Sequence, residues 1–98
     1  MSGRLEGKTA IVTGSTKGIG LGIAKAYVRE GARVVVNSRS AEDCASVARA
    51  LGPAAVAVAA DLSRSDEVRR LASESIAALG GTVDILVNNA GQPQTRSA

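Results

Sequence analysis

The N-terminal part of the chain contains a glycine-rich segment, Thr13-Gly14-Ser15-Thr16-Lys17-Gly18-Ile19-Gly20, with the spacing Gly-x3-Gly-x-Gly. Gly14 lets the backbone turn sharply, and Gly18 removes a side chain where a phosphate must come close to the backbone. Gly20 permits tight packing of a following helix against the strand, and the N–H groups at the start of that helix would attract an anion. The segment therefore predicts a cradle for a pyrophosphate, with an ordinary glycine-rich turn as the alternative.

A second group of polar residues, Asn37-Ser38-Arg39, follows an apolar run, and no acidic residue comes before Glu42. Proteins that bind NAD place an acidic residue about 20 residues beyond the glycines, where it accepts the ribose 2′-hydroxyl. Ser38 and Arg39 suit a 2′-phosphate instead, and Lys17 adds a second cation. These residues favour NADP(H), with NAD(H) and solvated surface cations as the alternatives.

The composition excludes several other chemistries. The chain has 98 residues, no histidine and one cysteine, Cys44, so we expect no metal site and no catalytic triad. The net charge is +3, but the basic residues are dispersed and Tyr27 is the single aromatic residue, so nucleic acid is not the expected partner. No secretory or membrane-spanning segment is visible, which predicts a cytoplasmic protein.

Two hydrophobic periods alternate along the chain and predict the elements that must position these residues. Apolar runs predict strands over 8–12, 33–36, 54–60 and 84–88. Helical spacing predicts helices from Gly18 to Glu30, from an N-cap at Ser40 to about Leu51, and from a capping box at Ser63 and Asp66 to Leu79. Glycines follow each helix, at Gly31, Gly52 and Gly80.

The alternation of short apolar strands with helices predicts an α/β fold. Strands of this kind are parallel and covered on both faces, and right-handed crossovers lead to a doubly wound sheet. We expect a Rossmann-like, incomplete sheet of four strands in the order 3-2-1-4 with three helices. In that order one helix alone covers one face, so an exposed apolar face should favour homo-oligomers or aggregation.

Three motifs, taken together, carry a family resemblance. The glycine segment, Asp61-Leu62 after the third predicted strand and Asn88-Asn89-Ala90-Gly91 after the fourth occur in order from about Leu5 to Gly91. In this the chain resembles the classical short-chain dehydrogenase/reductase family. It looks most like the 3-oxoacyl carrier-protein reductase and glucose dehydrogenase-like members.

The resemblance implies roles for individual residues. The backbone of the glycine segment, including Ser15, Thr16 and Ile19, would hold the pyrophosphate. Asp61 would accept the adenine amino group and Leu62 would flank the ring, while a helix-entry role is the alternative for Asp61. The residues from Asn88 to Gly91 would brace the central strands and line the adenosine ribose, with strand-end turn chemistry as the alternative.

The resemblance also implies what this sequence lacks. The family uses a Ser and a Tyr-x-x-x-Lys motif beyond the fourth strand. Tyr27 lies in the first predicted helix and is followed by Glu30 and Gly31 with no lysine at the motif spacing, so Tyr27 is predicted to be a packing residue. We therefore expect residues 1–91 to be the NADP(H)-binding half of an oxidoreductase that transfers hydride to or from a carbonyl or alcohol substrate. Residues 92–98 are a polar tail. No residue is assigned a catalytic role, and the 98-residue chain alone should be inactive. An inactive dinucleotide-binding module and a truncated product without function are the alternatives.

Overall fold

Strands and helices alternate along the whole described part of the chain. The computed structural model describes residues 3–90, so the predicted tail and Gly91 lie outside the described residues. The elements are β1 (Thr9–Val12), α1 (Gly18–Arg29), β2 (Arg33–Val36), α2 (Ala41–Leu51), β3 (Ala55–Ala57), α3 (Ser65–Ala78) and β4 (Ile85–Val87). The predicted order of elements is confirmed.

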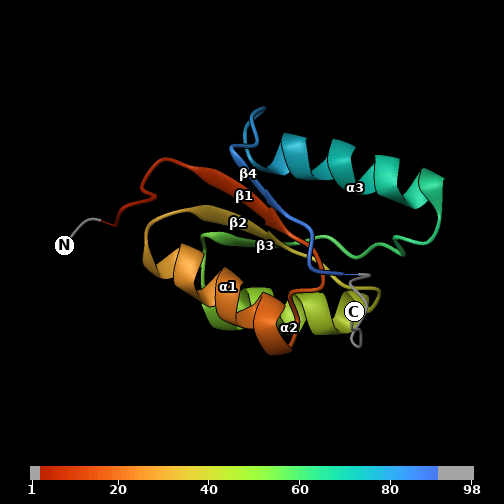
Figure 1. Ribbon diagram of the computed structural model, residues 1–98, viewed down its shortest axis with the longest axis horizontal. Coiled ribbons are helices and arrows are strands. Elements are labelled where there is room, and N and C mark those ends of the chain that lie inside the picture. Colours follow the sequence, from red (N-terminus) through yellow and green to blue (C-terminus); the bar gives the residue numbers. More distant parts are fainter. Residues whose placement is uncertain (1–2, 91–98) are drawn as a thin grey trace, which may run out of the picture.

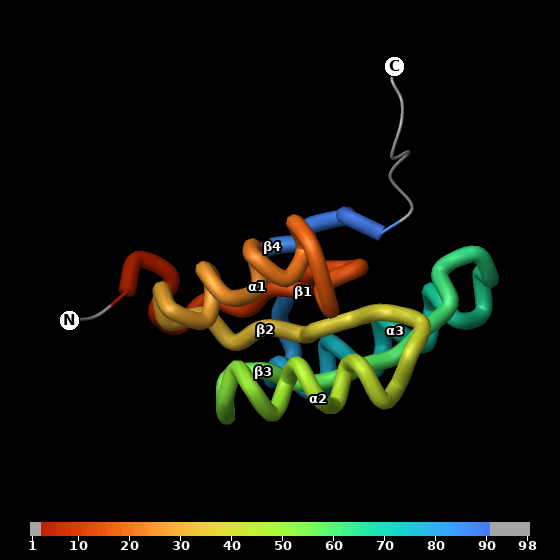
Figure 2. Tube along the Cα trace, turned by 90° about the horizontal axis from the view of Figure 1, so that it is seen from below, coloured from red at the N-terminus to blue at the C-terminus, as the bar shows by residue number. Residues whose placement is uncertain are grey.

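The four strands form one parallel sheet in the order β3-β2-β1-β4, as predicted. Ile11 on β1 is in register with Val35 on β2 and with Leu86 on β4, so the three side chains share one face. Figure 1 shows α3 alone on one side of the sheet and both other helices on the opposite side. In Figure 2, seen from that opposite side, α1 and α2 run alongside each other.

Alternating side chains of the central strands build two separate cores. Ala10, Val12 and Val34 are fully buried on the side of α1 and α2, where Tyr27 packs against them as predicted. Ile11 and Val35 point the other way and pack with Leu71 and Leu79 around α3. Because both faces of β1 and β2 are buried, their sequences are continuous apolar runs.

The predicted capping box at Ser63 is wrong. Helix α3 begins at Ser65 with Arg64 as its N-cap, and no side chain caps it. The Ser63 hydroxyl instead donates to Asp61 Oδ1 at 2.7 Å, and the Ser63 N–H donates to the same oxygen at 3.0 Å. A local turn around the Asp61 carboxylate therefore takes the hydroxyl away from the helix. The other predicted cap is confirmed, since Ser40 Oγ accepts the Asp43 N–H at 3.0 Å.

The face that carries α3 is incompletely covered. Leu86 on β4 is 67% exposed, and Val68 and Ile76 on α3 are 42% and 43% exposed. A single helix is narrower than four strands, and α3 lies behind β2 and β3 in Figure 2, so the β4 side of this face has no helix over it among residues 3–90. None of the helices in that same range is long and apolar enough to cross a membrane.

Replacing Ser75 with alanine should stabilise the protein. The Ser75 hydroxyl is fully buried on α3 and has no hydrogen-bond partner in the described structure. Removal of an unsatisfied buried hydroxyl, together with the better helix propensity of alanine, should raise the free energy of unfolding by about 1 kcal/mol. The exposed Ser73 is the control, because Ser73→Ala changes propensity alone. An equal rise in melting temperature for Ser75→Ala and Ser73→Ala would contradict this prediction.

Candidate functional site

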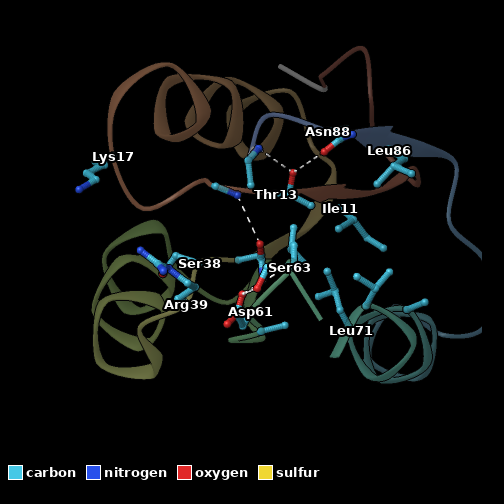
Figure 3. A pocket seen from close by; sticks show the side chains of 17 residues that line it. Ile11, Thr13, Lys17, Ser38, Arg39, Asp61, Ser63, Leu71, Leu86 and Asn88 are labelled. Atoms are coloured by element: carbon cyan, nitrogen blue, oxygen red, sulfur yellow. Dashed lines mark hydrogen bonds between the residues drawn. The ribbon is translucent and has the colours of Figure 1, made fainter. Parts of the chain in front are cut away.

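The carboxyl ends of the strands open into a pocket of about 970 Å³. It is lined by residues from all four strand ends: Ile11, Thr13, Gly14, Lys17, Asn37, Ser38, Arg39, Ala60, Asp61, Leu62, Ser63, Val68, Leu71, Ala72, Leu86, Asn88 and Ala90. In Figure 3, Lys17 and Arg39 lie at one end of the pocket and Leu71 and Leu86 at the other. Open α/β sheets bind ligands at this edge, where the strand order reverses between β1 and β4.

The glycine loop joins β1 to α1 and turns where the sequence predicts. Gly14 and Gly18 have φ angles of +61° and +62°, which residues other than glycine rarely adopt. A Cβ on Gly14 would lie 3.0 Å from the Ala90 backbone, whereas a Cβ on Gly18 would meet open space. The backbone at Gly18 is therefore accessible from outside, while Gly14 packs against the segment after β4.

The first turn of α1 keeps its N–H groups uncapped. Its N-cap is Lys17, whose side chain makes no capping hydrogen bond, and no acidic residue occurs in the first turn. At α2, by contrast, Ser40 caps the helix and Glu42 and Asp43 occupy the first turn. The start of α1 thus offers N–H donors and a positive dipole end to an external acceptor, which suits a phosphate group.

Ser15 is buried beneath the loop, and its side chain does not face the pocket. Its hydroxyl donates to the Val12 carbonyl oxygen at 2.7 Å and accepts the Asn37 N–H at 2.9 Å. Its own N–H donates to the Asn37 carbonyl at 2.8 Å. Ser15 therefore fixes the glycine loop against the end of β2. Its hydroxyl would affect a ligand only indirectly, by holding the backbone of the loop in place.

Asn37 is a site residue that sequence reasoning passed over. Its side chain is fully buried, accepts the Gly14 N–H at 3.3 Å and donates to the Val58 carbonyl oxygen at 3.0 Å. One amide thus connects the ends of three neighbouring strands. The available sequence indication was a polar residue directly after the buried run Val34–Val36.

A smaller polar pocket of about 180 Å³ lies between the glycine loop and the start of α2. It is lined by Thr16, Lys17, Ser38, Arg39, Ser40 and Asp43, so the structure brings together the predicted cations and hydroxyl groups. Cys44, fully buried on α2, helps to hold Ser38, whose N–H donates to Cys44 Sγ at 3.1 Å. The two cations should attract an anionic group, which Asp43 partly offsets.

Asp61 lies at the pocket edge after β3. Hydrogen bonds from the Ser63 hydroxyl and then from the Ser63 N–H hold the pKa of Asp61 below its ordinary value, with a smaller contribution from the Arg39 charge. Both Ser63 bonds go to Oδ1, so in the described structure Oδ2 is left to accept a donor from a ligand. The alternative that Asp61 is a helix-entry residue holds only in part, because Asp61 organises the turn before α3 but does not cap the helix. Leu62 is half-buried and packs against the core beneath α3.

The side chains of Thr13 and Asn89 hold the segment after β4 to the end of β1. Thr13 Oγ1 accepts the N–H groups of Asn89 and Ala90 at 2.9 and 3.0 Å, and Asn88 Oδ1 lies 3.4 Å from the same oxygen. Asn89 Nδ2 donates to the Gly14 carbonyl oxygen at 3.0 Å. These residues join the end of β1 to the end of the edge strand β4 at the pocket floor. Gly91 lies outside the described residues.

Within residues 3–90 no cluster of histidine, cysteine or acidic side chains could hold a metal ion. The two pockets offer uncapped backbone donors at the start of α1, the cations Lys17 and Arg39, the hydroxyl group of Ser38 and the Oδ2 atom of Asp61. Such groups bind and orient a phosphate-containing ligand.

Acid should destabilise this site through its carboxylates. The pKa of Glu67 is lowered chiefly by the Arg70 side chain and then by the Asp61 N–H, and the pKa of Asp61 is lowered by Ser63. A carboxylate whose pKa is lower in the folded state stabilises the fold above its unfolded pKa, and this stabilisation is lost as pH falls through the folded value. The free energy of unfolding should therefore fall below about pH 4.

Urea unfolding at pH 7 and at acid pH measures this effect. Glu67→Gln should show a smaller acid-induced loss than the unsubstituted chain, because it removes one of the responsible carboxylates. Glu42→Gln is the control, since Glu42 is exposed and makes no side-chain hydrogen bond in residues 3–90. Equal acid sensitivity of the two variants would refute the assignment to Glu67.

Comparison with known proteins agrees with this geometry. The model of the short chain dehydrogenase family matches residues 8–98. The sorbitol dehydrogenase of Cereibacter sphaeroides is 47% identical over 87 residues, covering 89% of this chain and 34% of that protein. The D-beta-hydroxybutyrate dehydrogenase of Cupriavidus necator is 46% identical over 90 residues, covering 89% of this chain and 34% of that protein.

Solved structures give the same result. The 3-ketoacyl-(acyl-carrier-protein) reductase of Brucella melitensis, complexed with NADH, superposes with a TM-score of 0.84 at 45% identity, covering 89% of this chain and 36% of that one. The RhlG/NADP active-site complex of Pseudomonas aeruginosa gives 0.81 at 45% identity, covering 90% and 36%. This chain spans about a third of the length of these relatives. The parallel sheet, the glycine loop and the match over residues 8–98 place the chain in the short chain dehydrogenase family, a family of oxidoreductases.

Proposed function

We propose that residues 1–91 form the NADP(H)-binding half of an oxidoreductase that transfers a hydride between the cofactor and a carbonyl or alcohol substrate. The observation that carries the choice of cofactor is the small pocket, which gathers Lys17, Ser38 and Arg39 beside the glycine loop. A 2′-phosphate would pair with these two cations and accept from Ser38, and no acidic residue occupies the end of β2.

Several features of the structure fit such a cofactor. The uncapped start of α1 and the open space at Gly18 suit a pyrophosphate, with Ile19 contributing its N–H. Asp61 Oδ2 would accept the adenine amino group, Leu62 would flank the ring, and Asn88 and Ala90 would line the ribose. A bound nicotinamide dinucleotide supplies the hydride chemistry, while these residues bind and orient it.

Titration with NADPH and NADH by calorimetry tests the proposal. We expect saturable binding with tighter affinity for NADPH. A lack of heat at millimolar NADPH would contradict any cofactor role and leave a chain without binding function. Tighter binding of NADH would overturn the choice of NADP(H).

The 98-residue chain by itself should bind the cofactor without turnover. Its one tyrosine, Tyr27, lies half-buried on α1 among core side chains, away from the pocket lining. This favours, as a second candidate, a dinucleotide-binding module that lacks catalysis. Oxidation of NADPH by the purified chain with a panel of ketones would contradict the expected inactivity.

We also propose that copies of this chain associate through the incompletely covered sheet face. Leu86 is 67% exposed there, and burial of a leucine side chain contributes about 1.5–3 kcal/mol. Leu86→Lys should shift sedimentation profiles from oligomers toward monomer. Ala45→Lys adds the same charge on the exposed surface of α2 and is the control. Identical profiles for both variants would refute this interface.

A further inference from the structure

Glu67 and Arg70 on α3 form an ion pair with two contacts. Arg70 Nη2 lies 2.7 Å from Glu67 Oε1, and Arg70 Nε lies 3.0 Å from Glu67 Oε2. Both side chains are partly covered: 40% of the Arg70 side chain and 26% of the Glu67 side chain are exposed. This two-point geometry fixes both side chains relative to each other, unlike a single-contact surface pair.

The pair also reaches out of the helix to the chain that leaves β3. Arg70 Nη2 donates to the Ala59 carbonyl oxygen at 2.7 Å, and Glu67 Oε1 accepts the Asp61 N–H at 3.3 Å. The two contacts lie on either side of Ala60, which lines the large pocket. The ion pair therefore holds, by two hydrogen bonds, the backbone from Ala59 to Asp61.

We propose that Glu67 and Arg70 are positioning residues for Asp61, holding its carboxylate at the pocket edge so that Oδ2 meets the adenine ring. The inference rests on the proposed cofactor function. The Asp61 side chain is bonded to Ser63 within its own turn, so that turn needs an external anchor to keep a fixed place at the pocket. The contacts to Ala59 and Asp61 supply this anchor from α3, while the Ala60 N–H, which donates to the Ser38 carbonyl oxygen at 3.0 Å, holds the same backbone to the end of β2.

Helix stabilisation alone does not account for these contacts. The pair of Arg70 with Glu74, at 3.3 Å, lies along the helix, as an ordinary surface pair does. The bonds to Ala59 and Asp61 leave the helix and join it to the strand exit. Each residue of the pair favours the charged form of the other, since the Glu67 pKa is lowered and the Arg70 pKa is raised.

The test uses the 98-residue chain with two probes, 5′-AMP and inorganic pyrophosphate, each titrated by NMR chemical shifts. Arg70→Met keeps the apolar stem and removes every polar contact of the guanidinium. It should weaken 5′-AMP binding about tenfold, the size expected for loss of one well-placed charged or polar contact. Pyrophosphate affinity should stay within about twofold, because in the described structure the Arg70 side chain bonds to Ala59, Glu67 and Glu74, none of which belongs to the glycine loop.

The neighbouring Arg69 is the matched control. It is exposed, makes no hydrogen bond or ion pair in the described structure, and Arg69→Met removes the same charge. Binding of 5′-AMP to Arg69→Met should stay within about twofold of the unsubstituted chain. Glu67→Gln keeps an acceptor for the Asp61 N–H, so its affinity for 5′-AMP should lie between those of the unsubstituted chain and Arg70→Met. If only the charge of Glu67 mattered, retention of this acceptor would not preserve affinity.

The outcomes separate the two proposals. Failure of the unsubstituted chain to bind 5′-AMP and NADPH would overturn the proposed function, and the positioning role with it. Normal binding of 5′-AMP by folded Arg70→Met would overturn the positioning role alone. Equal weakening of 5′-AMP and pyrophosphate would also overturn it, because it would show a merely structural effect. If Arg70→Met does not fold, Arg70→Lys and Glu67→Gln decide, and unchanged 5′-AMP affinity in both refutes the proposal.

Discussion

Gly20→Ala should strongly destabilise the protein and abolish cofactor binding. A Cβ at this position would collide with the Gly14 carbonyl oxygen and would lie 2.7 Å from Asn89 Nδ2. Neither neighbour can retreat easily, because Asn89 donates to that same carbonyl at 3.0 Å. We expect a loss of about 3 kcal/mol in the free energy of unfolding, at the upper end of overpacking effects. That loss should lower the melting temperature by about 12–24 °C.

Gly22→Ala is a matched control on the same helix. A Cβ on Gly22 would meet nothing within 4 Å, and Gly22 is exposed on α1. Its replacement should raise the free energy of unfolding by about 1 kcal/mol through helix propensity alone. Thermal melts and NADPH titration of both variants measure the contrast. Similar melting temperatures would mean that α1 does not pack on the glycine loop as closely as the structure shows.

Arg39→Asp should reverse the cofactor preference. The substitution removes a cation from the small pocket and places a carboxylate there, next to Ser38. Loss of a charge-assisted contact, together with new repulsion, should weaken NADPH binding by about 10- to 100-fold. NADH affinity should hold or improve, because a carboxylate can accept the ribose 2′-hydroxyl.

Paired titrations with NADPH and NADH give the affinity ratio that decides this prediction. Arg69→Asp makes the same change of charge at an exposed position of α3 outside both pockets, so its ratio should match that of the unsubstituted chain. Added salt should weaken NADPH binding more than NADH binding in the unsubstituted chain. An unchanged ratio in Arg39→Asp would refute the 2′-phosphate role of this arginine.

Local sequence was sufficient for the order of elements and for most of their ends. Buried parallel strands need apolar residues on both faces, so Val34–Val36 are recognisable without any partner. Helix ends depend on the nearest few residues, and Gly31 and Gly52 adopt φ angles of +99° and +100° just after α1 and α2. There were two exceptions. The third strand was predicted over 54–60 but spans only Ala55–Ala57. The Ser63 hydroxyl was predicted to cap α3 but bonds to the Asp61 carboxylate instead.

The candidate site was predictable where its residues directly follow strands in the sequence. The glycine loop and the residues Ser38, Arg39 and Asp61 stand next to strand ends in the sequence, and parallel strands bring their carboxyl ends to one edge. The supporting residues could not be found in this way. Asn37 acts through bonds to Gly14 and Val58, which are distant in sequence, so its position directly after a buried run does not reveal these partners.

The sequence by itself determined the family, the alternation of strands and helices, and the kinds of groups that gather at the pocket edge. Periodicity, glycine spacing and charge are local properties, so they can be read along the chain. Only the tertiary structure decided how those groups are held: Ser15 under the loop, Cys44 behind Ser38, and the Glu67–Arg70 pair across the exit of β3. Hydrogen bonds of this kind join residues whose separation in space is fixed by packing of the whole sheet.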